Sequence, residues 1–121
     1  MFEPVDYFKL AVEINQSHKH QAGYRCVVSR AYYSAFLAAR NASGVSSKEQ
    51  DGHQRVAQYF HNKGDSKSGT LANRLDAMRT ERKDADYDCV KEVNHLNSGR
   101  TLASAQKVLE SLGVIVPPAK T

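Results

Sequence analysis

The sequence predicts an all-α fold, an up-and-down bundle of four to five helices that forms a single domain over residues 1–121. Three observations predict it. Apolar residues recur at helical spacing in several separate segments, short polar links divide these segments, and the only strand signal is a short terminal run at 114–116. A chain of 121 residues buries enough surface to fold around one core without a metal or a disulfide. We expect the core over about residues 5–112 and an extended tail over 113–121.

The first helix is expected to begin directly after Pro4, because proline suits the first turn of a helix. Its apolar face follows the spacing i, i+3, i+4 and i+7. The residues on this face are Tyr7, Leu10, Ala11 and Ile14.

The second helix is expected over Gln21–Ser43, with Gly44 placed to end it. Its residues between 22 and 39 leave almost no polar face, which is typical of a buried central helix. Arg30 lies in the middle of this helix. A buried arginine needs a carboxylate or several carbonyl groups as partners, so we expect Arg30 to have them.

The third helix is expected to follow a polar link over residues 45–52 and to end at Gly64. Asp51 and Gln54 have the spacing of a capping box at its start. Its apolar face consists of His53, Val56, Ala57 and Phe60.

The fourth helix follows a second polar link at 65–69 and carries an apolar stripe at i, i+4 and i+7, formed by Leu71, Leu75 and Met78. The next position of this stripe is Arg82. An arginine in that position points toward the protein interior, so it requires an acceptor, and Asp86 lies one helical turn further on. We therefore expect Arg82 and Asp86 to form an ion pair at the end of the fourth helix.

The last helix is expected to begin between Asn94 and Ser98, both of which are good N-cap residues, after a turn at 89–93. Gly113 is placed to end it. Its apolar face consists of Leu102, Ala105, Leu109 and Leu112.

The composition restricts the possible partners only weakly. The net charge is +4, and the densest positive group is Arg79, Arg82 and Lys83, with acidic residues around it. This permits contact with RNA or with an acidic protein, but does not require it. Cys26 and Cys89 belong to no CxxC pair, so we expect free thiols, no metal site and no cofactor.

No segment approaches the roughly 20 apolar residues of a membrane span, and the first residues have no apolar signal-peptide core. We therefore expect a cytoplasmic protein with no membrane contact.

Three segments together resemble the HEPN family. The second helix contains Arg30-Ala-Tyr-Tyr33, the third helix contains His53, and the fourth ends in Arg82-Lys-Asp-Ala-Asp-Tyr87. They resemble the branch of small HEPN proteins that carries Arg-Ala-Tyr-Tyr, a downstream histidine and Arg-x-x-Ala-Asp-Tyr, in this order. The resemblance covers about residues 5–112.

The resemblance implies a dimeric helical bundle that acts in a toxin–antitoxin pair, often with a nucleotidyltransferase-like partner, or in defence against phage. Many family members are metal-independent ribonucleases that carry an arginine followed, after a spacer of four to six residues, by a histidine. In such a pair the histidine moves protons, while the arginine stabilises charge on the phosphate.

This sequence departs from the ribonuclease pattern. No histidine stands at the required distance after Arg79 or Arg82. Arg55 is followed by His61, but six residues of a helix turn through about 240°, so the two side chains diverge and we treat this match as a coincidence.

Two function classes therefore remain, beside a third possibility in which the chain is a purely structural dimer. The first is a non-catalytic HEPN-like module that binds a protein partner or RNA, with Arg30, Tyr33, His53 and Arg79 as candidate binding residues. The alternative is a metal-independent ribonuclease with an altered active site, and its candidate catalytic residues are Arg82, Asp86 and Tyr87. Tyrosine and aspartate have ordinary pKa values of about 10 and 3.9, poorly matched to proton transfer at neutral pH, which favours the first class.

Each candidate residue also has a purely structural interpretation. Arg82 and Asp86 can serve as a structural ion pair, Tyr87 as a polar core residue, and His53 as a half-buried histidine. The aromatic group of Tyr32, Tyr33 and Phe36 is more than one thin bundle readily hides, which predicts packing against a second copy in a homodimer.

Overall fold

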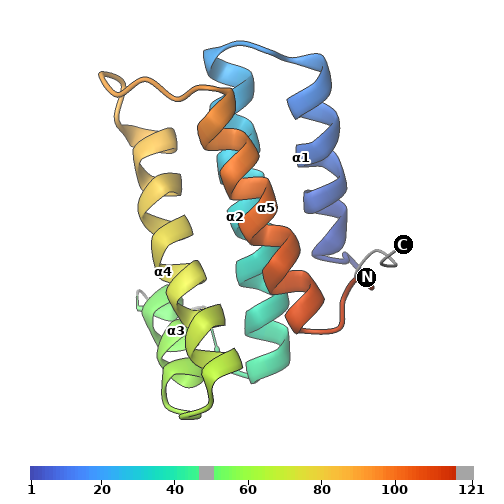
Figure 1. Ribbon diagram of the computed structural model, residues 1–121, viewed down its shortest axis with the longest axis vertical. Helices are drawn as coiled ribbons and strands as arrows, with labels where there is room; N and C mark the ends of the chain where they lie inside the picture. The colour runs from blue at the N-terminus through green and yellow to red at the C-terminus, as the bar shows by residue number, and fades with distance from the viewer. Residues whose placement is uncertain (47–50, 117–121) are drawn as a thin grey trace.

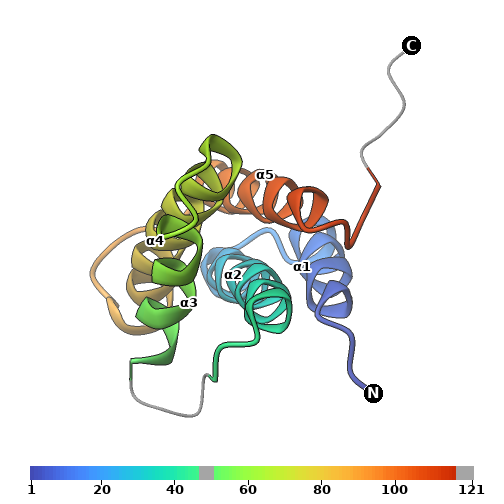
Figure 2. The same ribbon diagram turned by 90° about the horizontal axis from the view of Figure 1, so that it is seen from below.

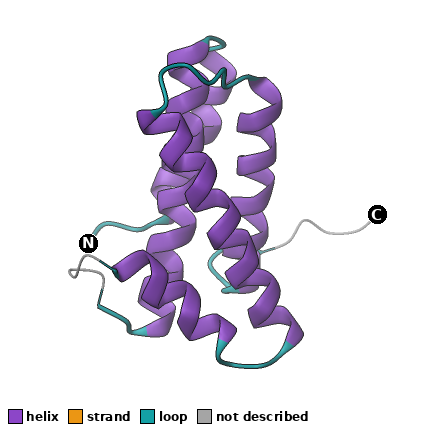
Figure 3. Cartoon of the chain, turned by 90° about the vertical axis from the view of Figure 1, so that its left-hand side faces the viewer, coloured by secondary structure: helices purple, strands orange, loops and turns teal. Residues whose placement is uncertain are grey.

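The computed structural model describes residues 1–46 and 51–116, and they form helices joined by loops (Figure 3). Within the described residues there is no strand, which confirms the predicted all-α class. The helices, in chain order, are α1 (Val5–Ser17), α2 (Gln21–Ser43), α3 (Gly52–His61), α4 (Ser66–Tyr87) and α5 (His95–Ser111).

Four long helices alternate in direction, and the short α3 packs beside the first half of α4 (Figure 1). Seen along the bundle, α2 has α1 on one side and α4 with α3 on the other, while α5 lies across a third side between α1 and α4 (Figure 2). The up-and-down topology is therefore confirmed, and α2 is the helix that all the others contact.

The central position of α2 follows from its residues. Ala31, Ala35 and Ala39 are completely buried, and their small side chains let neighbouring helices approach closely. The larger side chains of Tyr32 and Phe36 fill the remaining space, with 1% and 3% of their surface exposed. One stripe of α2 still reaches the surface, because Cys26 is exposed and Tyr33 is only half-buried.

Local capping fixes most helix ends. Asn94 and Asn97 form a capping box at the start of α5, and the Asp65 carboxylate accepts a hydrogen bond of 2.9 Å from the Ser68 amide at the start of α4. Gly44 ends α2 with a φ of +72°, a conformation that favours glycine. The predicted capping box of α3 is wrong, because the Asp51 side chain makes no capping hydrogen bond.

Two further expectations need correction or restriction. Leu10 is not part of the buried face of α1: it is 41% exposed, and the residues that pack inward are Phe8, Ala11 and Ile14. The fifth helix starts after Asn94, while Ser98 is buried and donates a 2.7 Å hydrogen bond to Asn15. Residues 47–50 of the polar link at 45–52 and residues 117–121 of the expected tail lie outside the described part of the chain.

A polar contact, which we call the carbonyl clamp, joins the start of α2 to the far end of α4 and the link beyond it. The Arg25 guanidinium donates to the carbonyl oxygens of Asp84 (3.4 Å), Ala85 (3.0 Å) and Lys91. The Gln21 side-chain amide both donates to and accepts from the main chain of Val93, at 2.6 and 3.2 Å. The Ala85 carbonyl is one of those that the end of α4 leaves without a helical partner, whereas the Asp84 carbonyl also accepts from the Asp88 amide at 2.9 Å.

No helix in the described residues is both long enough and apolar enough to cross a membrane.

Candidate functional site

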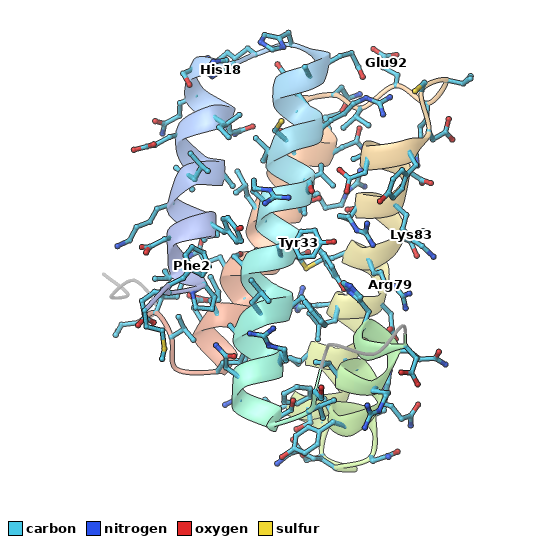
Figure 4. The ribbon with its side chains drawn as sticks, turned by 180° about the vertical axis from the view of Figure 1, so that it is seen from behind. Phe2, His18, Tyr33, Arg79, Lys83 and Glu92 are labelled. Atoms are coloured by element: carbon cyan, nitrogen blue, oxygen red, sulfur yellow. The ribbon has the colours of Figure 1, made fainter. Side chains whose placement is uncertain are left out.

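Aromatic and positively charged side chains gather where α2, α3 and α4 meet. We call them the tyrosine–arginine cluster, defined as Tyr32, Tyr33, His53, Arg79 and Arg82. Figure 4 views this face, with Tyr33 on α2 and Arg79 and Lys83 on α4. The spacings i, i+3 and i+4 place Arg79, Arg82 and Lys83 on one side of α4.

Arg82 is the most buried charged residue of this face. Only 7% of it is exposed, as its place in the apolar stripe predicts. Its guanidinium carbon lies 5.7 Å from the ring centre of Tyr32 and 5.5 Å from that of Tyr33, within cation–π range. Its Nη1 atom is 3.5 Å from Oδ2 of Asp86, so the predicted contact between these residues is present.

The same carboxylate oxygen of Asp86 links two arginines through a serine. The hydroxyl of Ser29 on α2 donates to Asp86 Oδ2 at 3.3 Å, and Nη2 of Arg30 donates to that hydroxyl at 3.2 Å. Asp86 is 28% exposed at its side chain, so the network lies at the rim of the interior rather than deep within it. The network therefore positions Arg82 from two helices.

Arg30 differs from the expectation for a buried arginine. It is only half-buried, and its acceptor is the Ser29 hydroxyl rather than a carboxylate or a set of carbonyl groups. Its guanidinium lies over two rings, 4.9 Å from the centre of Tyr7 and 5.3 Å from that of Tyr33. Tyr33 is thus in cation–π contact with both Arg30 and Arg82.

His53 connects α3 to this cluster. Its ring stacks on Phe36 with ring centres 4.1 Å apart, and its Nδ1 atom lies 2.6 Å from the hydroxyl of Tyr32. Burial, followed by the positive charges of Arg79, Arg82 and Lys83, lowers the pKa of His53 to about 4. The ring is therefore neutral at neutral pH. Burial also raises the pKa of Tyr32 well above its ordinary value, so its hydroxyl keeps its proton.

Two guanidinium nitrogens in the cluster are buried without a partner. These atoms are Nε of Arg79 and Nε of Arg82. Within residues 1–46 and 51–116, Arg79 forms no ion pair and no hydrogen bond through its side chain, although it is half-buried. Buried donors are usually paired, and buried charges almost always are, so this arrangement requires an explanation.

Two sequence-based interpretations of aromatic residues are wrong. Tyr87 is not a core residue, because it is 76% exposed at the end of α4, with its ring centre 6.0 Å from the Arg82 guanidinium. The aromatic group that suggested a dimer is mostly covered within one chain, since Tyr32 and Phe36 are almost fully buried. Only Tyr33 of that group reaches the surface.

Other candidate groups lie apart from the cluster. His61 is bonded to Asp76, with Nε2 and Oδ2 3.0 Å apart. Cys26 and Cys89 are both free and exposed. In the part of the chain that the structure describes, no group of three or more histidine, cysteine, aspartate or glutamate side chains is arranged to hold a metal ion.

The structure brings together most of the residues that the sequence singled out, namely Arg30, Tyr33, His53, Arg79, Arg82 and Asp86. Sequence reasoning missed Ser29, which joins Arg30 to Asp86 across 57 positions of the chain. It also missed the bond between Tyr32 and His53. A serine in the buried central helix was the only signal for the first contact, and Ser34 carries the same signal without making such a contact. The second contact had no signal beyond the two residue types.

The fold and this face define an all-α bundle domain with a mixed basic and aromatic surface. Comparisons with protein-family models, with curated proteins and with solved structures find no match to this chain.

Proposed function

We propose that the chain is a HEPN-like module without catalytic activity that binds single-stranded RNA through the tyrosine–arginine cluster, as a component of a toxin–antitoxin or phage-defence system. The observation that carries the RNA-binding proposal is the combination, on one face, of accessible tyrosines with Arg79, whose side chain has no partner among the described residues. Lysine and arginine bind the phosphate backbone, and exposed aromatic rings stack on unpaired bases. Tyr87 is exposed and Tyr33 half-exposed beside these cations, which supports this class of ligand.

The state of His53 argues against the alternative of a ribonuclease with an altered active site. A catalytic histidine needs a pKa near the working pH, whereas that of His53 is about 4. Its Nδ1 atom is also occupied by the Tyr32 hydroxyl. Asp86 is engaged by Ser29 and Arg82, so it is committed to holding the helix end rather than to moving a proton.

The remaining parts of this proposal rest on the family resemblance. We propose a nucleotidyltransferase-like protein as a partner, and a homodimer as the working form. The mostly buried Tyr32 and Phe36 do not support that dimer, so its interface is expected elsewhere on the surface. We propose the cytoplasm as the location, because the exposed thiols of Cys26 and Cys89 persist in a reducing compartment.

Binding of a fluorescently labelled single-stranded RNA, measured by anisotropy over a range of salt concentrations, tests the proposal. Lys83→Gln should weaken binding to all RNA sequences alike. It should also reduce the slope of log affinity against log salt concentration by about one, the effect of one lost phosphate contact. The matched control is Lys107→Gln, which removes the same charge from an exposed position on α5 and should change little. Equal effects of both substitutions, or no saturable binding, would contradict the proposal.

Incubation of the same RNA with the protein in the absence of metal decides between the non-catalytic module and the ribonuclease. We expect no cleavage by the wild-type protein. Cleavage that is abolished in a folded Arg82→Met variant would favour the ribonuclease alternative instead.

A further inference from the structure

We propose that Arg79, Arg82, Lys83 and His53 form a binding site for a phosphate group at the junction of α2, α3 and α4. This inference deepens the proposed function, because it names the chemical group that the face recognises. It stands on observations that do not involve the family resemblance.

The site contains two guanidinium donors that have no partner among the described residues. A guanidinium removed from water loses its hydration and must regain hydrogen bonds. Arg82 is 7% exposed and has Asp86 for Nη1, yet its Nε atom is buried without an acceptor. Arg79 has a buried Nε atom as well and forms no side-chain hydrogen bond or ion pair with any described residue. Both Nε atoms are closed to solvent, so an incoming anion with several oxygen atoms binds the other nitrogens of these guanidinium groups, which are not buried without a partner.

The second observation is the balance of charge. Arg79, Arg82 and Lys83 all contribute positive potential at His53. One carboxylate of α4, that of Asp86, is in contact with this group of cations. The other three acidic residues of α4 have partners outside this group: Asp76 is bonded to His61, Glu81 to Thr101 and Arg100, and Asp84 to Lys91. The site therefore keeps an excess of positive charge, which suits a phosphate with one or two negative charges.

The third observation concerns Nε2, the ring nitrogen of His53 that is not bonded to Tyr32. The Tyr32 hydroxyl keeps its proton and lies 2.6 Å from Nδ1, so it can donate to this nitrogen. A neutral imidazole that accepts at Nδ1 carries its proton on Nε2, which makes Nε2 a donor. His53 also belongs to the first turn of α3, at the positive end of the helix dipole, where the Asp51 side chain provides no cap.

A phosphate group is favoured over a carboxylate for two reasons. Several donors converge here from two helices, more than the two oxygen atoms of one carboxylate accept well, and a phosphate offers an additional oxygen and can carry a second negative charge. Such a group can come from the RNA backbone, from the end of an RNA, from a mononucleotide or from free phosphate. The chemistry at the site is the same in each case, so the sources are separated by experiment.

The direct test is a titration of the folded protein with inorganic phosphate at constant ionic strength, followed by NMR of the His53 ring, with chloride as the matched salt. Bound phosphate offsets the charges of Arg79, Arg82 and Lys83, so it should shift the His53 signal saturably and raise its pKa. The chloride control should produce neither change. A linear response that is the same for both salts would overturn the proposal.

Substitutions locate the site. Arg79→Gln should weaken phosphate binding at least about tenfold, because hydrogen bonds to a charged group are lost. Arg79→Lys should restore only part of it, since lysine keeps the charge but not the planar fork. Lys107→Gln is the control and should bind as the wild type does. Unchanged phosphate affinity in Arg79→Gln would contradict the assignment even if Arg82 variants fail to fold.

Three ligands separate this inference from the proposed function. Inorganic phosphate, a nucleoside 5′-monophosphate and a single-stranded RNA should all compete for the site. If phosphate binds and RNA does not, the site stands and the RNA-binding function fails. If RNA binds without competition from phosphate and independently of Arg79, the phosphate site fails while RNA binding stands.

Discussion

Two polar regions join α2 to α4, and they differ in how their charges are satisfied. In the carbonyl clamp, Arg25 donates to three main-chain carbonyl groups and to the side chain of Gln21. In the tyrosine–arginine cluster, Arg82 has one carboxylate contact at 3.5 Å, and Arg79 has no acceptor in the described chain.

This difference separates a structural arginine from a binding arginine. The clamp uses its donors on main-chain carbonyl groups at the end of α4 and in the link to α5, so it ties that link to α2. The cluster holds its cations in place through aromatic rings and Ser29, but leaves donors unused. Unused donors in a positioned side chain are expected where a ligand completes the site.

The largest effect on stability is expected at Arg82, which is both a structural arginine and a member of the tyrosine–arginine cluster. Arg82→Ala leaves a cavity beside Tyr32 and removes the partner of Asp86. We expect a loss of about 2 kcal/mol or more in the free energy of unfolding, below the roughly 3–5 kcal/mol of a fully buried pair because Asp86 is 28% exposed. Thermal and urea melts measure it. Arg82→Met, which keeps the volume, should lose less, and equal melts of wild type and Arg82→Ala would disprove a structural role.

A smaller loss is expected when the clamp is opened. Arg25→Gln removes the bonds to Asp84, Ala85 and Lys91, and glutamine is too short to replace them. Because these bonds lie partly exposed, we expect a loss of about 1 kcal/mol in total in the free energy of unfolding. Hydrogen exchange should show that the amides near the end of α4 lose protection first. RNA binding should be unchanged, and a loss of RNA affinity in this variant would remove the distinction between the two regions.

The pH dependence of stability should come in part from the cluster. The ordinary pKa of histidine is 6.5, and that of folded His53 is about 4, so the unfolded chain binds more protons between these values. Stability should therefore decrease as the pH falls from about 6.5 toward 4. Urea melts at several pH values measure this slope. His53→Gln should flatten it, whereas His95→Gln, an exposed position at the start of α5, should not.

The smallest effect on stability is expected at Arg79. Arg79→Gln removes a cation that has no acceptor in the described chain, so the free energy of unfolding should change by no more than about 0.5 kcal/mol. It can even rise slightly, because an unpaired charge is no longer held away from water. A large loss of stability in a urea melt would mean that Arg79 is structural after all.

The features that could be predicted from the sequence are those that depend on residues close together in the chain. Helix number, direction and the central place of α2 follow from apolar periodicity, which depends on neighbours a few positions apart. The inward direction of Arg82 follows from the same stripe of Leu71, Leu75 and Met78. Contacts between distant residues, such as those from Ser29 to Asp86 and from Arg25 to Lys91, leave no local pattern and required the structure.

Some local expectations also failed because tertiary packing decides them. Tyr87 shares a motif with Arg82 but lies five positions further along α4, about 140° round the helix from the buried stripe, so it is exposed rather than buried. Leu10 occupies an apolar position of α1, yet the helix turns Phe8 and Ala11 toward the core instead. Asp51 has the capping-box spacing with Gln54, but its backbone has a φ of −95° and a ψ of 16° rather than the extended conformation of a usual N-cap.

The most direct measurement compares the two arginines in one experiment. Melting temperatures of wild type, Arg25→Gln and Arg79→Gln are recorded with inorganic phosphate and with chloride at equal ionic strength. A ligand that binds the folded state raises the melting temperature. We predict that Arg25→Gln melts lower but keeps the rise caused by phosphate, whereas Arg79→Gln melts like wild type and loses that rise. If Arg79→Gln keeps the phosphate effect, or Arg25→Gln loses it, the division between a structural clamp and a binding cluster is wrong.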